Sequence, residues 1–150
     1  MIENQNFTSL SPFSIGRIAE YWAKLALTLK GYDVYTSEVD DKGIDFVAKN
    51  SLGNFINVQV KSARLESTSY IFIAKKAEWE NALKRNDLFL ALVLFQNNEY
   101  PRFYLIPSTA WKKENDLLRD RKYDKGQKSV PEWGLNISKK NLTLLEAYKL

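Results

Sequence analysis

The sequence predicts one α/β domain. This prediction rests on a helical stripe of apolar residues near the N-terminus, on several strand-like segments after it, and on the chain length. A chain of 150 residues can bury one sizeable core but is too short for two ordinary domains. Hydrophobic residues make up 45% and charged residues 27% of the chain, a composition typical of folded proteins. We therefore treat residues 1–150 as a single domain without repeats or linkers.

The first regular element is expected to be an amphipathic helix over residues 14–30. Its apolar positions recur at intervals of three and four residues, and Gly31 provides a stop signal. These positions are Ile15, Ile18, Ala19, Trp22, Ala26 and Leu29. Residues 1–13 precede the helix as a polar leader with no clear period, and we assign no role to them.

Three strands are expected next, joined by turns rich in Asp, Asn and Gly. Residues 32–39 alternate and contain β-prone side chains, and the sequence Asp-Asp-Lys-Gly at 40–43 interrupts them. A second strand is predicted over 44–49, and the turn residues 50–54 return the chain into a third strand over 55–62. The second and third strands therefore form a predicted β-hairpin.

The second half of the chain combines predicted strands and helices. Residues 88–96 form a nearly unbroken apolar run, which is typical of a central strand buried on both faces. The other expected elements are a strand over 70–74, a helix over 77–85, a strand over 102–106, a helix over 108–118, a charged and turn-rich segment over 119–132, an edge strand over 134–138 and a closing helix over 141–148.

Composition excludes several kinds of chemistry. The chain has no cysteine and no histidine, which rules out disulfide frameworks, zinc-finger ligand sets, thiol nucleophiles and histidine general bases. Its net charge of +4 is compatible with nucleic acid binding but is weak evidence for it. No apolar run approaches the ~18 residues of a membrane span and no signal peptide is recognisable, so we expect a cytoplasmic, intracellular protein with no membrane partner.

The predicted hairpin gathers three polar side chains on one face. If residues 50–54 form its loop, Asp45 lies opposite Gln59 across the two strands. Side chains alternate along a strand, so Lys61 points the same way as Gln59, while Ile56, Val58 and Val60 point to the core. A carboxylate, an amide and an ammonium would then lie within roughly 5 to 8 Å of one another.

The preceding helix adds a second carboxylate to this group. Glu20 lies on the flank of the apolar stripe, in a row with the small residues Gly16 and Ala23, which leave room around it. Two carboxylates and an amide oxygen suit a hard divalent cation such as Mg²⁺, and a lysine beside the cation would orient a hydroxide for attack on a phosphate. The arrangement predicts a phosphodiester hydrolase.

In this order and spacing, the residues resemble the PD-(D/E)XK nuclease superfamily. The matching features are Glu20 in the first helix, then Gly43-Ile44-Asp45, then Gln59-Val60-Lys61. They lie in a motif-bearing core over residues 14–63, about a third of the chain. The resemblance implies a restriction-endonuclease-like α/β core, with a central mixed β-sheet flanked by helices, that acts as a metal-dependent DNA endonuclease with Mg²⁺ or Mn²⁺.

The resemblance also implies roles for single residues. Asp45 would be the central metal carboxylate, Gln59 would occupy the (D/E) position, and Lys61 would be the catalytic lysine. Glu20 would be the helix carboxylate, and the Val60 carbonyl a further metal ligand. The glutamine departs from the superfamily pattern, since a neutral amide keeps an oxygen lone pair but removes a negative charge; the proline before the central acid is also absent. The Q-x-K form is similar to that of small homing endonucleases encoded by group I introns of cyanobacteria.

Double-stranded DNA is the expected partner of such a protein. Basic side chains would contact phosphates, and Asn57, which shares the face of Gln59, could touch the substrate. The basic candidates are Lys75, Lys76, Arg119, Arg121, Lys122, Lys125 and Lys128. Because one such site cuts one strand, a double-strand cut would require a homodimer or homotetramer.

Plainer interpretations stay open for these residues. A glutamate on a helix flank is most often solvated, an aspartate near a glycine most often belongs to a turn, and a basic run is often a soluble loop. Asp40 and Asp41 could add a metal contact, although a turn explains them better. Two alternatives concern the whole protein. One is a catalytically inactive DNA- or protein-binding module of the same fold, and the other is an interaction subunit whose polar cluster is structural.

Overall fold

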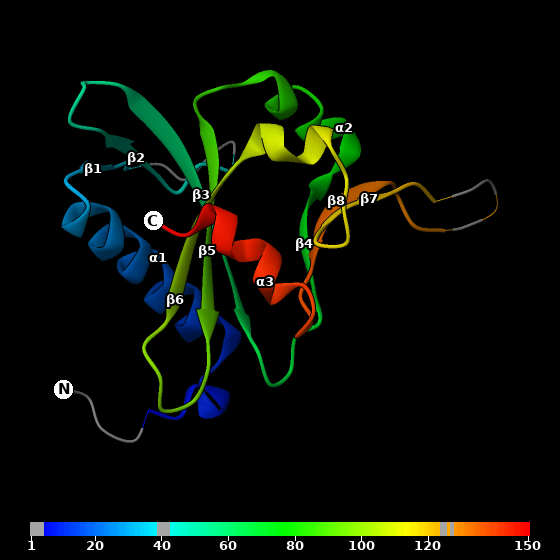
Figure 1. Cartoon of the computed structure of the whole chain (residues 1–150), viewed down its shortest axis with the longest axis horizontal. Helices are drawn as coiled ribbons and strands as arrows, with labels where there is room; N and C mark the ends of the chain where they lie inside the picture. Colours follow the sequence, from blue (N-terminus) through cyan, green and yellow to red (C-terminus); the bar gives the residue numbers. More distant parts are fainter. Residues whose placement is uncertain (1–4, 39–42, 124–125, 127) are drawn as a thin grey trace.

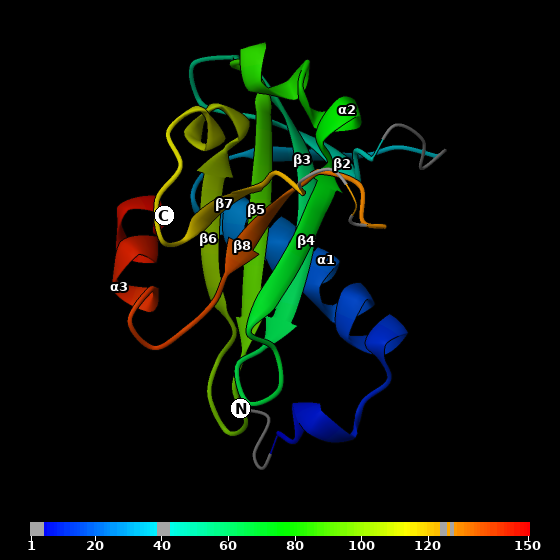
Figure 2. The same ribbon diagram turned by 90° about the vertical axis from the view of Figure 1, so that its right-hand side faces the viewer.

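The strands of this protein divide between a large and a small sheet (Figures 1 and 2). The computed structural model describes residues 5–38, 43–123, 126 and 128–150. The large sheet has the strand order β1-β2-β3-β5-β6, and the small sheet has the order β4-β8-β7. The strands are β1 (Asp33–Thr36), β2 (Phe46–Lys49), β3 (Phe55–Arg64), β4 (Tyr70–Lys75), β5 (Leu88–Phe95), β6 (Arg102–Pro107), β7 (Leu118–Arg121) and β8 (Glu132–Asn136). The helices are α1 (Pro12–Leu29), α2 (Lys76–Trp79) and α3 (Leu142–Leu145), with 3-10 helices at Phe7–Ser9, Ala82–Lys84, Ser108–Lys112 and Glu146–Tyr148.

Helix α1 is bounded by residues that favour its two ends. The Ser11 hydroxyl accepts a hydrogen bond from the Ser14 backbone N–H at 3.1 Å, and Pro12 occupies the first turn, where an N–H is not needed. Gly31 follows the helix with a φ of 84°, a left-handed conformation that favours glycine. The predicted helix is confirmed, although it begins at Pro12, inside the segment that the sequence suggested was a leader.

Strand β5 is an interior strand of the large sheet, between β3 and β6. It runs parallel to β3 and antiparallel to β6, and β2 pairs antiparallel with β3, so the sheet is mixed. Val93 and Phe95 pack in the apolar cluster beneath α1, whereas Leu92 and Leu94 pack in the cluster on the other face. The prediction of a strand buried on both faces is therefore confirmed, as is the mixed sheet, although the middle strand of the five is β3.

The two faces of the large sheet have different covers. Helix α1 lies across one face, and the small sheet with its neighbouring helices packs on the other, so that Figure 2 shows the small sheet in front of the large one and α1 behind it. Trp111 and Trp133 are buried in the core beneath the small sheet. Among the described residues, no helix is long and apolar enough to cross a membrane.

The chain after β6 differs from the sequence-based expectation. The predicted helix over 108–118 is a 3-10 helix of five residues, Ser108–Lys112, and β7 follows soon after it. The side-chain oxygen of Asn115 accepts hydrogen bonds from the backbone N–H groups of Leu117 and Leu118, at 2.9 and 2.8 Å. This local turn competes with helix formation and directs the chain into a strand.

Other elements differ in position or length. The predicted edge strand over 134–138 is β8, which lies in the middle of the small sheet because the segment predicted as turns over 119–132 supplies β7 as its neighbour. The predicted helices over 77–85 and 141–148 each consist of one short α-helical turn and one 3-10 helix. Segments this short have little helical stability of their own, so tertiary packing decides their conformation.

In the small sheet, Tyr70 lies across the glycine of β8. A Cβ added to Gly134 would collide with the Tyr70 hydroxyl, which donates a hydrogen bond to Glu132 Oε1 at 3.1 Å. From β7, the guanidinium carbon of Arg121 lies 3.5 Å from the centroid of the same ring. One aromatic ring thus connects all three strands, and it requires a residue without a side chain beneath it.

We expect Gly134→Ala to destabilise the protein by about 1–3 kcal/mol, because the new methyl group would displace Tyr70 in a packed region. Urea unfolding measures this loss. The matched control is Gly16→Ala in α1, where an added Cβ meets no atom within 4 Å and should stabilise the helix by ~0.5–1 kcal/mol. Equal unfolding midpoints for the two variants would contradict the packing of Tyr70 on Gly134.

Candidate active site

The β2–β3 hairpin has the register that the sequence predicts. Its pairing ends with Phe46 opposite Val58. The Asp45 backbone N–H then donates to the Val58 carbonyl at 2.9 Å, which continues the ladder by one bond. Asp45 therefore lies beside Gln59, at the point where β2 separates from β3.

The side chain of Asp45 takes over where the strand pairing stops. Its Oδ2 accepts a hydrogen bond from the Val60 backbone N–H at 2.6 Å. In a strand, the N–H and C=O of one residue point to the same side, so the Val60 carbonyl faces this edge of β3 too. A carboxylate and a backbone carbonyl consequently lie together at the unpaired part of the strand.

Val58 packs in the apolar cluster beneath α1. Because side chains alternate along a strand, Gln59 and Lys61 lie on the other face of β3, which points away from α1. Gln59 Oε1 is buried and accepts no hydrogen bond from the described residues. Lys61 is half-buried, and this burial lowers the pKa of its ammonium, while the negative charge of Asp45 partly offsets the shift. The structure thus brings together the carboxylate, the amide and the ammonium of the hairpin.

Glu20 lies on α1, at the opposite face of the large sheet from Lys61. The ammonium of Lys24, one turn further on, is 5.6 Å from the ring centroid of Phe46, and Arg64 at the end of β3 donates to a backbone carbonyl just before α1 at 2.8 Å. Helix α1 therefore runs antiparallel to β3 (Figure 1). A helix rises ~1.5 Å and a strand ~3.3 Å per residue, so one turn of α1 spans about two residues of β3. The half-buried Glu20, one turn before Lys24, therefore lies at the level of β3 where β2 no longer pairs with it.

Oxygen atoms of several kinds are available at this edge of β3. The Asp45 carboxylate, the Val60 carbonyl and the Gln59 amide oxygen are hard donors, the kind that Mg²⁺ takes in proteins. In the part of the chain that the structure describes, no group of three or more acidic, cysteine or histidine side chains could hold a metal ion. A cation here would have few charged ligands and keep several waters, as Mg²⁺ commonly does. The buried, unpartnered oxygen of Gln59 is the observation that fits such an ion.

A pocket of about 540 Å³ opens beside Gln59, between the large sheet and the edge of the small one. Residues 43–44, β4 and the segment around α2 form its walls. Phe72, Asn81 and Arg85 line this pocket, and sequence reasoning missed all three. Phe72 sits in an ordinary strand pattern and the other two in a helical one, so no local signal indicated that they meet.

Asn57, a predicted substrate contact, is engaged within the fold. Its side-chain amide donates to Asp87 Oδ2 at 2.8 Å, and the guanidinium of Arg85 donates to both oxygens of the same carboxylate. The hydrogen bonds from Arg85 hold the pKa of Asp87 below its usual value. This network favours a structural role for the Asn57 amide.

The predicted DNA-binding basic residues are placed differently from one another. Lys76 donates to both carboxylate oxygens of Asp120, at 3.1 and 3.0 Å, and Arg121 lies over the ring of Tyr70, so the small sheet holds both. Arg121 is nevertheless exposed, as are Lys75, Lys122 and Lys128, while Arg119 is half-buried. Outside the described residues lie Lys125, Asp40 and Asp41.

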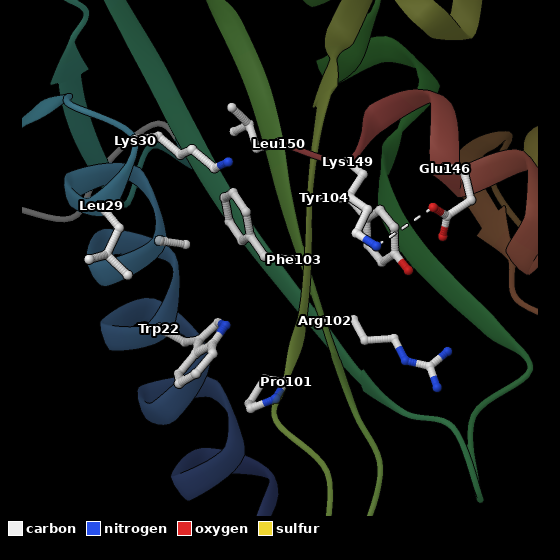
Figure 3. Close-up of a pocket in the computed structure, with 11 residues that line it drawn as sticks. Trp22, Leu29, Lys30, Pro101, Arg102, Phe103, Tyr104, Glu146, Lys149 and Leu150 are labelled. Atoms are coloured by element: carbon white, nitrogen blue, oxygen red, sulfur yellow. Dashed lines mark ion pairs between the residues drawn. The ribbon is translucent and has the colours of Figure 1, made fainter.

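A second pocket, of about 520 Å³, lies at the far edge of the large sheet, next to β6. Figure 3 shows Trp22 and Leu29 of α1 on one side of it and Phe103 of β6 on the other, with Leu150 at the chain end. The residues that line it include none of the predicted site residues. The candidate site therefore belongs to the hairpin and not to this groove.

Two solved structures resemble the chain as a whole. One is the Holliday junction resolvase Hjc of the archaeal hyperthermophile Archaeoglobus fulgidus, with a TM-score of 0.53, 13% sequence identity, and 89% of this chain and 88% of that chain covered. The other is the bacterial homing endonuclease I-Ssp6803I, with a TM-score of 0.50, 23% identity, and coverage of 79% and 81%. The chain has the fold of these nucleases. No family model and no curated protein matches it.

The predicted fold class is thereby confirmed as a restriction-endonuclease-like α/β core with a central mixed sheet. A second β-sheet, which the sequence did not predict, provides much of the cover on the face away from α1.

We expect Lys61→Met to raise the melting temperature at pH 7, because folding removes a charged ammonium from water. The pKa of Lys61 is lowered in the folded state, so the unfolded chain binds more protons between that pKa and the ordinary lysine value of about 10.4. The wild type therefore regains stability as pH rises through this window, and the advantage of the variant should shrink. Thermal unfolding of both proteins between pH 6 and 9.5 measures the difference in melting temperature.

The matched control is Lys49→Met in β2. Its ammonium interacts with Tyr35 and with Asp33, which raise its pKa, so this variant should lose stability where the Lys61 variant gains it. A lower melting temperature for Lys61→Met at pH 7 would show that burial of the Lys61 ammonium does not destabilise the folded state.

Proposed function

We propose that this protein is a metal-dependent DNA endonuclease that hydrolyses phosphodiester bonds. The observation that supports it best is the convergence of Asp45, Gln59 and Lys61 where β2 leaves β3, with the Gln59 oxygen buried and unpartnered. The similarity to a Holliday junction resolvase and a homing endonuclease supports the choice of DNA as substrate.

The donor atoms would hold one Mg²⁺ or Mn²⁺ ion. Asp45 supplies a carboxylate, Gln59 its amide oxygen and Val60 its backbone carbonyl, and Glu20 would reach past the unpaired edge of β3 from α1. A bound cation supplies Lewis-acid stabilisation of the phosphate charge and lowers the pKa of water near it. With a glutamine at the second position, the protein follows the Q-x-K form of the superfamily.

Lys61 would act on the attacking water. Its ammonium, held beside Asp45, donates a hydrogen bond to the water oxygen and stabilises its hydroxide form by charge. That oxygen gives up a proton to bulk water and bonds to phosphorus, while the ester oxygen on the opposite side leaves with the electron pair of the broken bond and takes a proton from solvent. The exposed lysines Lys75, Lys122 and Lys128 would contact neighbouring phosphates, and Arg119 would assist them.

A cut through both DNA strands needs two such sites, so we also propose that the active form is a homodimer or homotetramer. The runner-up is a binding module of the same fold in which Gln59, by removing one negative charge, has ended catalysis.

Asp45→Asn and Lys61→Met should each slow divalent-dependent cleavage of supercoiled plasmid DNA by at least about 100-fold, because each removes a charge that acts on the reacting groups. Agarose gels of nicked and linear plasmid, with and without chelator, measure the rate. The matched controls are Asp33→Asn and Lys49→Met, an acid and a lysine 3.4 Å apart on β1 and β2, which should keep near-wild-type rates.

Full activity of Asp45→Asn would contradict the proposal. If the wild type binds DNA in a salt titration yet cuts none with Mg²⁺ or Mn²⁺, the inactive binding module is the correct interpretation.

Gln59→Glu should lower the Mg²⁺ concentration for half-maximal cleavage by about tenfold, since an added charge needs to contribute only ~1.4 kcal/mol to the cation's binding. Glu20→Gln should raise that concentration for the converse reason. Glu99→Gln, at the turn between β5 and β6, is the control and should leave it unchanged. An unchanged Mg²⁺ requirement in Glu20→Gln would remove Glu20 from the ligand set.

A further inference from the structure

The pocket beside Gln59 adjoins the candidate active site directly. Gln59 offers its oxygen to the proposed site and also lines the pocket. The volume of about 540 Å³ falls in the range of small-ligand sites. A group bound there would have Gln59 as a neighbour in common with a phosphate held at Asp45 and Lys61.

One wall of this pocket is an exposed aromatic ring. Phe72 lies in β4 and leaves 44% of its surface exposed, although it lines a concave site. Between Phe72 and Ala74 the register with β8 shifts, and such bulges redirect side chains at sheet edges. An exposed ring beside a phosphate-binding site is a surface on which a base can stack.

The other walls carry hydrogen-bonding groups rather than positive charge. β4 is an edge strand of the small sheet, so the backbone on its outer side is not used by β8. Asn81 is exposed and caps no helix with its side chain, and the charge of Arg85 is balanced by its pair with Asp87. Glu78 also lines the pocket and would repel a phosphate. The chemistry favours a neutral, planar, polar-edged group.

We propose that this pocket receives one unpaired nucleobase of the DNA, stacked on Phe72 and hydrogen-bonded by Asn81 and the free edge of β4. This inference rests on the proposed function, because it takes the phosphate of the same strand to lie at Asp45 and Lys61. A base paired within a duplex cannot enter the pocket without leaving its stack, which costs a few kcal/mol, and an already unpaired base avoids that cost. The substrate class is therefore DNA with an unpaired nucleotide at the cleavage point, in preference to fully paired duplex.

A binding experiment tests the pocket without cleavage. The probes are two short duplexes, one with a single bulged 2-aminopurine and one with 2-aminopurine paired to thymine, titrated with the whole protein in chelator at 50 mM NaCl. The bulged probe should bind about tenfold more tightly, and its fluorescence should fall as the base stacks on Phe72. Phe72→Ala should lose both effects, whereas Phe72→Tyr should keep them. Phe55→Ala, another strand phenylalanine that is 55% exposed, should behave as wild type.

Cleavage of the same probes with Mg²⁺ separates this inference from the endonuclease proposal. Cleavage that Asp45→Asn abolishes, with no preference for the bulged probe, would overturn the base pocket and leave the endonuclease intact. A Phe72-dependent preference in binding with no cleavage at all would support the pocket and overturn the endonuclease. Equal affinity of the wild type for both probes, or a preference that persists in Phe72→Ala, also overturns the pocket.

Discussion

The separation of β2 from β3 beyond Phe46 and Val58 is the feature on which the candidate site depends. A strand that loses its neighbour leaves backbone N–H and C=O groups that must be satisfied in another way. At Val60 the partner is the Asp45 carboxylate, at 2.6 Å. That bond fixes the carboxylate against the backbone of β3, beside Gln59 and Lys61. One side chain therefore ends the pairing of two strands and places a negative charge at the centre of the site.

The layers around the large sheet set the electrical character of this site. α1 covers one face and the small sheet the other, so Lys61 is half-buried. Its ammonium has therefore lost part of the hydration that an exposed lysine keeps. Interactions between charges are stronger in such surroundings than in water. The same burial lowers the pKa of Lys61, so the surroundings that would strengthen its proposed action on water also reduce the stability of the fold.

Local patterns were enough to predict the part of the fold that carries the hairpin residues. Side-chain alternation and a five-residue loop define the register that sets Asp45 beside Gln59, and the run over 88–96 identifies a strand buried on both faces. The small sheet was beyond such reasoning, because β4 pairs with β8 from far along the chain and leaves no local signal of that pairing. The pocket lined by Phe72 is missed for the same reason. The position of Glu20 relative to β3 depends on how α1 packs along the sheet, and the spacing of apolar residues in the helix does not determine that position.

The neutrality of Gln59 also affects how the site would be occupied. Asp45 and Lys61 carry opposite charges and interact, so this part of the hairpin is close to balanced before anything binds. The fold does not need a cation to relieve repulsion between acids. A dication entering alone would leave an excess of positive charge, and an anionic DNA backbone entering alone would meet little attraction. Each would therefore raise the affinity for the other by the same factor, so cation and nucleic acid would load as a thermodynamically linked pair.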